Sequence, residues 1–198
     1  DAWREDGGDY EQEEPDRYRG ETPFEITLPY YGYQHVDMVT DHGDRCGGHY
    51  QQWFRRTVPD WQALQDPDNQ LPHDYACPQA YRTPIPEELY STAYVRDRTI
   101  DYLKSQADAD DPFFAFVSFP DPHHPFNPPG KYWDLYRPED FSVPLPYEAH
   151  RNPTPPMRNI HDAWKSNATL VSPQTATMAT ERQLQEAMAL SAGMIGMI

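Results

Sequence analysis

Two adjacent histidines, His123 and His124, directly follow an apolar run and are held between prolines. The run, residues 113–119, has the length and apolar character of a buried strand, and ligands in α/β proteins bind beyond the carboxyl ends of strands. Pro122 and Pro125 restrict the backbone of this loop, so a side chain there loses little entropy on binding. An imidazole in that place can hydrogen-bond an anionic ester or protonate a leaving oxygen. The pattern predicts His123 as a catalytic residue and His124 as a substrate contact, with packed or solvent-facing histidines as the alternative.

His42 and His49 belong to a second polar segment, residues 41–49, which also contains Asp41 and Asp44. Carboxylates and imidazoles are metal ligands. Their spacing here matches no closed zinc pattern, and two adjacent glycines in the segment are typical of a turn. We therefore predict no metal site in this chain. We interpret His42 and His49 as pocket-lining, substrate-contacting residues, with plain turn structure as the alternative.

The chain is strongly acidic, since 32 acidic residues against 16 basic ones give a formal net charge of −16. Such a charge repels nucleic acids and anionic lipid surfaces, so neither is expected as a partner. It also repels anionic esters at long range, so binding one requires local positive charge such as a metal ion. An aromatic share of 14% argues against simple disorder. The two cysteines, Cys46 and Cys77, are as compatible with free thiols as with a disulfide.

Twenty-two prolines and ten glycines leave few long uninterrupted segments. Hydrophobic periodicity and helix start signals nevertheless predict several elements. They are a turn followed by a short strand within residues 28–39, a short helix from Gln51 that ends before Pro59, a helix from Pro86 to near Ser105, a strand over residues 113–119 buried on both faces of a parallel sheet, one turn over residues 131–136 and a helix over residues 180–198.

The last helix has the clearest pattern. Residues 180–183 resemble a capping box, and the apolar positions that follow recur at helical spacing. Because the pattern reaches residue 198 while still amphipathic, we expect the sequence to be an internal segment of a larger protein. The expected apolar face consists of Leu184, Ala187, Met188, Ser191, Ile195 and Ile198.

Several stretches resemble the sulfatase family of the alkaline-phosphatase superfamily, which includes aryl- and choline-sulfatase-like enzymes and phosphonate monoester hydrolases. Residues 112–126 are similar to the family's strand that ends in a P-H-x-P-F signature, and residues 128–136 fit the segment that follows. Residues 94–103 and 189–198 resemble helices of the family. Residues 32–50 are a weaker match to an H-G-D-x-x-x-G-H-Y segment.

The resemblance implies an α/β fold, with this chain forming part of an αβα sandwich that has a large irregular, proline-rich content. It implies hydrolysis of a small-molecule sulfate ester, or of a phosphate or phosphonate monoester. The complete enzyme would use a formylglycine nucleophile and Ca²⁺ or another divalent cation, neither of which is expected to be bound by this chain alone. His123 matches the histidine that assists the leaving oxygen in the family.

The departures from the family pattern are as informative as the match. The sequence contains no C/S-x-P/A-x-R motif for formylglycine, which residues 77–81 fail, and no early acidic pair. We therefore expect an internal segment of a single sulfatase-like catalytic domain that depends on the rest of its parent enzyme and is inactive alone. The alternatives are an acidic, proline- and tyrosine-rich protein-binding module or an inactive truncated product.

We divide the chain into an acidic loop (1–23), a loop-rich part with a short strand (24–86), a helix, strand and histidine loop (87–126), a proline-rich excursion (127–179) and the final helix (180–198).

Overall fold

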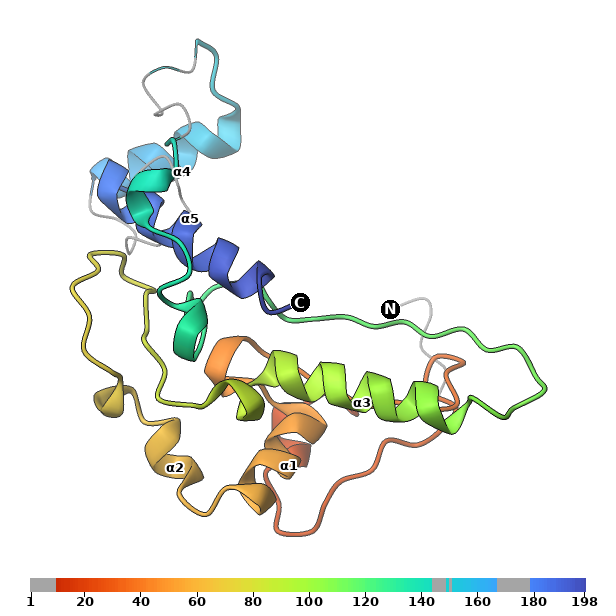
Figure 1. Ribbon diagram of the computed structural model, residues 1–198. Helices are drawn as coiled ribbons and strands as arrows, with labels where there is room; N and C mark the ends of the chain where they lie inside the picture. The colour runs from red at the N-terminus through yellow and green to blue at the C-terminus, as the bar shows by residue number, and fades with distance from the viewer. Residues whose placement is uncertain (1–9, 144–148, 150, 167–178) are drawn as a thin grey trace.

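A computed structural model describes residues 10–143, 149, 151–166 and 179–198 (Figure 1). Parts of the predicted acidic loop and of the proline-rich excursion therefore lie outside the described residues. Regular structure in the described part is helical. The α-helices are α1 (Gly48–Thr57), α2 (Trp61–Leu64), α3 (Ser91–Ser105), α4 (Pro155–Lys165) and α5 (Glu181–Ile195), and the 3-10 helices are η1 (Pro15–Tyr18), η2 (Gly43–Arg45), η3 (Pro67–Asn69), η4 (Glu87–Leu89), η5 (Gly130–Tyr132) and η6 (Pro138–Asp140).

The predicted α/β fold, an αβα sandwich, is wrong for this chain, because the described residues form no sheet. Their β-pairing is confined to two isolated bridges, Tyr30 with Tyr33 and Ala80 with Phe126. Residues 33–39 and 113–119 are not strands; the second segment is extended and runs back alongside α3 (Figure 1). A strand needs neighbours to pair with, and the described part of the chain supplies none for these segments.

The apolar run 113–119 is consequently exposed rather than buried. Phe114 is 74% exposed and Phe116 69% exposed. Phe113 makes an edge contact with the Tyr102 ring of α3, with the ring centroids 5.8 Å apart. This segment therefore presents a row of apolar side chains to solvent, which is uncommon on a monomeric surface.

The predicted helices are confirmed, with small shifts at their ends. A 3-10 turn over Glu87–Leu89 precedes α3, which ends at the predicted Ser105. Helix α1 includes the predicted segment from Gln51 and ends at Thr57, two residues before a proline that cannot continue a helix. The predicted turn over residues 131–136 overlaps η5.

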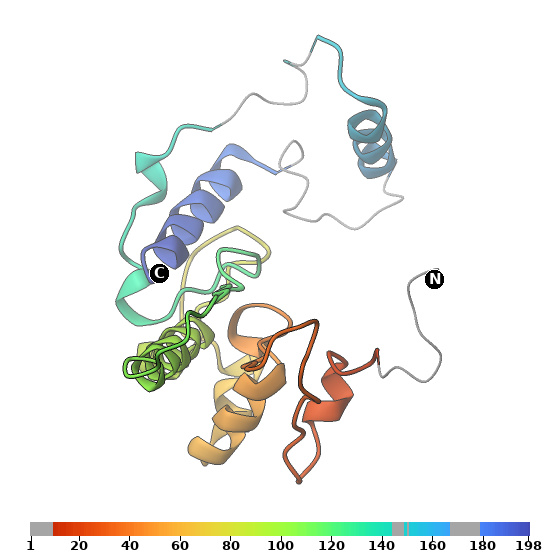
Figure 2. The same ribbon diagram turned by 90° about the vertical axis from the view of Figure 1, so that its right-hand side faces the viewer.

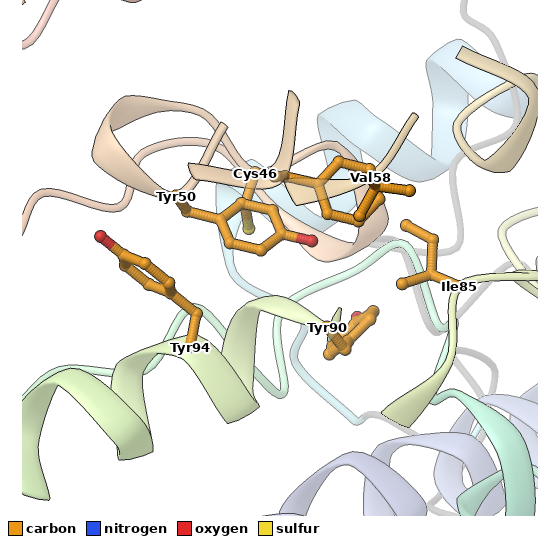
Figure 3. Close-up of a cluster of buried hydrophobic side chains, with 7 residues drawn as sticks. Cys46, Tyr50, Val58, Ile85, Tyr90 and Tyr94 are labelled. Atoms are coloured by element: carbon orange, nitrogen blue, oxygen red, sulfur yellow. The ribbon is translucent and has the colours of Figure 1, made fainter. Parts of the chain in front are cut away.

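Helices α1 and α3 pack side by side through a cluster of buried side chains, here called the first core (Figures 1 and 3). Tyr50 of α1 meets Tyr94 of α3 edge-to-face, with ring centroids 5.6 Å apart. The Tyr50 hydroxyl donates to the Leu89 carbonyl at 2.9 Å, so the buried phenol keeps a partner. The first core consists of Cys46, Tyr50, Phe54, Val58, Ile85, Tyr90 and Tyr94.

A second core lies against α5 and contains Cys77, Ala80, Trp133 and Leu190. The predicted capping box is confirmed, since Thr180 accepts from the Gln183 backbone and Gln183 accepts from the Thr180 backbone. Figure 2 shows α5 on one side of α3 and α1 on the other, with α4 set apart from them.

The buried face of α5 differs from the predicted one. Ile195 and Ile198 of the predicted face are exposed, at 58% and 60%. Glu186 is fully buried instead, because its carboxylate accepts from the Cys77 backbone N–H at 2.7 Å and from Arg182 at 2.6 Å. Hydrophobic periodicity assigns only apolar residues to the buried face of a helix. It therefore does not predict a buried carboxylate whose oxygens accept hydrogen bonds there. The buried residues of α5 are Glu186, Ala189, Leu190, Gly193 and Met194.

Gly193 allows α5 to approach the η5 backbone. A Cβ at this position would lie 2.3 Å from the Tyr132 carbonyl oxygen. That backbone atom cannot move away as a flexible side chain can.

In the described part of the chain, no helix is both long and apolar enough to cross a membrane.

The two phenylalanines Phe54 and Phe114 give a matched test of this arrangement. Phe54→Ala should lower the free energy of unfolding by about 3–5 kcal/mol, since it opens a cavity in the first core. Phe114→Ala should change it by less than about 0.5 kcal/mol, because the ring is already in water. Urea unfolding of both variants measures the difference. Equal losses would contradict the described burial.

Gly193→Ala should lower the free energy of unfolding by about 1–3 kcal/mol through overpacking against η5. Gly196→Ala is the control three residues further on, where the nearest atom outside the helix is the flexible end of Leu135 at 3.0 Å. Thermal and urea unfolding compare the two. A Gly193→Ala variant as stable as Gly196→Ala would show that α5 does not approach η5 this closely.

Candidate active site

The loop of residues 120–127 carries the two predicted histidines. His123 is exposed and His124 half-buried. The His123 backbone N–H donates to the Pro120 carbonyl at 3.2 Å, which closes a turn. The loop is joined to the rest of the chain where the Phe126 backbone pairs with residues 79 and 81. The turn presents the His123 ring on a short, hydrogen-bonded scaffold.

His42 lies directly against this loop, although 81 residues separate it from His123 in the sequence. The His42 and His123 rings stack, with centroids 3.8 Å apart and planes at 20°. The His123 and His124 ring centroids are 4.0 Å apart. We call His42, His123 and His124 the histidine cluster. It brings together three of the four histidines predicted as site residues.

His49, the fourth, lies elsewhere. Its Nδ1 accepts from the Met38 backbone N–H at 3.0 Å, and its ring packs edge-on against buried Tyr18 with centroids 5.5 Å apart. Burial lowers the pKa of His49, which favours the neutral ring. These contacts pack His49, in the first turn of α1, against Met38 and Tyr18.

The hydrogen bond of His123 fixes its tautomer. Its Nδ1 lies 2.7 Å from the His124 carbonyl oxygen. A carbonyl oxygen only accepts, so Nδ1 carries the hydrogen and donates. Nε2 is then the ring nitrogen left to exchange a proton with a bound molecule.

Burial and repulsion by neighbouring rings favour the neutral forms of His42 and His124. Burial and, second, the charge of His123 lower the pKa of His42 below its usual value, while Asp41 partly opposes this. Burial followed by the charges of His123 and His42 lowers the pKa of His124. A charge on His123 therefore disfavours protonation of His42 and of His124. An anion bound at the cluster would supply the charge that makes a protonated ring favourable.

Beneath the cluster, four buried side chains form what we call the polar junction: Asp44, Tyr90, Asp121 and Asn127. The Tyr90 hydroxyl donates to Asn127 Oδ1 at 2.8 Å. The Thr92 hydroxyl donates to the Asp121 carboxyl. Asp44 Oδ2, Asp121 Oδ1 and Asn127 Nδ2 are buried without a hydrogen-bond partner among the described residues.

The two carboxyls of the polar junction have pKa values shifted toward neutrality. Burial raises the pKa of Asp44 to about 6, against the opposing effects of Arg45, Thr83 and Asn127. Burial likewise raises the pKa of Asp121 to about 6. Such groups exchange protons near neutral pH, which ordinary surface carboxyls do not.

A cavity of about 490 Å³ lies beside the chain segments on either side of His42. Asp41, Arg45 and Trp61 are among its lining residues, whereas none of the three clustered histidines lines it. The histidine cluster is therefore not part of the wall of this cavity.

The described residues do not fit the calcium ion or the formylglycine that the sequence resemblance implies. No group of three or more histidine, cysteine or acidic side chains within them is arranged to hold a metal ion. Cys46 and Cys77 are free thiols but are buried, and burial raises the pKa of both. A buried thiol with a raised pKa is a poor nucleophile.

Comparison with known proteins confirms the predicted resemblance to sulfatases. The chain is 42% identical over 59 residues to an arylsulfatase of Clostridium perfringens, a match that covers 30% of the chain and 12% of that protein. It is 39% identical over 51 residues to the uncharacterized sulfatase YidJ of Escherichia coli, covering 25% of the chain and 10% of the relative. It is 33% identical over 115 residues to an ulvan-active sulfatase of Formosa agariphila, covering 56% of the chain and 20% of the relative.

The chain is thus similar to segments of sulfatases and matches no more than a fifth of the length of these relatives. No family model matches it. The names of the relatives place the similarity among sulfatases.

The pH dependence of stability tests the burial of Asp121. Its pKa is raised from 3.8 to about 6, so its contribution to stability is complete below about pH 4 and is lost as pH rises through about 6. Asp121→Asn keeps an oxygen acceptor for Thr92 and cannot ionise. The variant should gain stability relative to the parent chain as pH rises from about 4 to 7.

Urea unfolding of both proteins across this pH range measures the effect. Asp108→Asn, the same change on an exposed side chain, controls for the large negative net charge. A stability difference between Asp121→Asn and the parent chain that does not vary with pH would contradict the raised pKa.

Proposed function

We propose that this chain forms one wall of the active site of a sulfatase-like hydrolase, in which His123 contacts the ester oxygen. The observation that carries the proposal is the stack of His42 on His123, which joins two segments far apart in the sequence. The similarity to an arylsulfatase and an ulvan-active sulfatase supports a sulfate ester as substrate. Phosphate and phosphonate monoesters have the same tetrahedral, anionic centre and are the alternative substrates.

In this proposal His123 works through its Nε2. The bond from Nδ1 to the His124 carbonyl orients the ring, so a proton on Nε2 can be donated to the leaving oxygen. His42, stacked at 3.8 Å, and His124 contribute further donors to the anion. Because burial and neighbouring rings lower the pKa of His42 and His124, these two rings favour the neutral form beside His123.

The nucleophile, the divalent cation and the remaining anion contacts would come from parts of the parent enzyme outside these 198 residues. We propose a formylglycine and Ca²⁺ there, on the strength of the sulfatase resemblance. Because the described residues do not fit either group, we derive no reaction step through them here, and we propose that the isolated chain is inactive.

Replacement of His123 in the complete protein tests the proposal. His123→Ala should lower turnover of 4-nitrophenyl sulfate by about 10²–10⁴-fold, the usual cost of losing a general acid. His35→Ala is the matched control, because this exposed ring pairs with Asp37 and stacks on Tyr102, outside the cluster. A His123→Ala enzyme with parental kinetics would remove His123 from the reaction.

The isolated chain gives a second test. It should release no 4-nitrophenol above the buffer rate, with or without added Ca²⁺, since both thiols are buried and no metal-binding group is present among the described residues. Turnover by the purified chain that disappears in a His123→Ala variant would overturn the proposal that its nucleophile lies elsewhere.

The exposed residues Phe114 and Phe116 favour one alternative, a protein-binding module. In that case the histidine cluster has no ligand. Titration of the complete protein with sulfate in the presence of Ca²⁺, followed by NMR of the imidazole rings, distinguishes the two. Shifts confined to the cluster support the hydrolase, and no shifts favour the binding module.

A further inference from the structure

We propose that Asn127 is the positioning residue of the histidine cluster: its buried amide joins the His42 turn to the His123 loop and so sets the stacking of the two rings. The catalytic meaning of this role depends on the proposed function. The positioning itself does not, because it can be measured without substrate.

Asn127 lies where three segments of the chain meet. It follows His123 by four residues and is 0% exposed. Its Oδ1 accepts from Tyr90, the residue that precedes α3, at 2.8 Å. Its amide also lies close enough to Asp44 of η2 to favour the ionised carboxylate. One side chain therefore contacts the His42 turn and the start of α3 while belonging to the His123 loop.

The contact with the His42 turn runs through Gly43. This residue has φ of +62°, in the left-handed region that favours glycine. A Cβ there would lie 2.7 Å from Asn127 Oδ1, 2.8 Å from Asn127 Nδ2 and 3.0 Å from Pro125 Cγ. The Gly43 carbonyl accepts from the Ser91 hydroxyl at 3.4 Å on the α3 side. Gly43 is thus closely packed against the Asn127 amide, and His42 is its immediate neighbour.

This geometry makes the stack sensitive to Asn127. The His42 and His123 rings are largely exposed, so their own packing constrains them little. Their centroid separation of 3.8 Å is shorter than the usual range for aromatic pairs, about 4.5–7 Å. A change in the Gly43–Asn127 contact would therefore move the rings apart.

The test measures the titration of each imidazole by NMR in the full 198-residue chain and in its variants. Asn127→Ala and Gly43→Ala should raise the pKa of His42 toward the ordinary value near 6.5, because separating the loops removes both burial and the charge of His123. The pKa of His124 should rise less, because His124 loses burial and the charge of His42 but keeps His123 beside it. Asp41 remains next to His42 in sequence and acts in the same direction. Tyr90→Phe removes the hydroxyl donated to Asn127 and should give a smaller rise.

Asn69→Ala is the matched control, since that exposed amide donates to the Ala63 carbonyl outside the cluster. A purely structural Asn127 would lower the free energy of unfolding without changing the imidazole titrations. Folded Asn127→Ala with parental His42 and His124 titrations would therefore overturn the proposal. If Asn127→Ala and Gly43→Ala both unfold, Tyr90→Phe decides, and parental titrations in that variant would overturn it.

Discussion

The stack of His42 on His123 depends on the buried hydrogen-bonding groups beneath it. Two exposed imidazoles gain little from stacking alone, and they repel each other when both are protonated. Their positions are set by the backbone turns that carry them, and these turns meet at the Asn127 amide. The site is therefore positioned by buried polar groups, which hold two weakly attracting side chains in contact.

This arrangement links the first core to the site. Tyr90 packs among the apolar side chains of that core while its hydroxyl reaches Asn127 in the polar junction. Packing of α1 against α3 thus fixes one end of the hydrogen bond on which the cluster depends. Three polar atoms of the junction lack a partner among the described residues, which costs stability that the neighbouring packing offsets. Groups held in this way are typical of functional sites.

The sequence predicted the parts of the chain that obey local rules. The capping box of α5 and the end of α3 follow from nearest neighbours in the sequence. The prediction of a sheet is wrong because residues 113–119 need partner strands that the described residues lack. Asp121 and Asn127 were not predicted as buried residues of the site, since proline-flanked polar residues are typical of exposed turns. The sequence gives one indication of their role, which is that they lie close on either side of the predicted catalytic residue His123.

The most direct measurement of the central claim is the distance between the two rings in solution. Nuclear Overhauser effects between the ring protons of His42 and His123, recorded on the 198-residue chain above pH 7, report contact within a few ångströms. The account predicts clear cross-peaks between the two rings. Their absence, with both histidines assigned and the first-core tyrosines in contact, would contradict it.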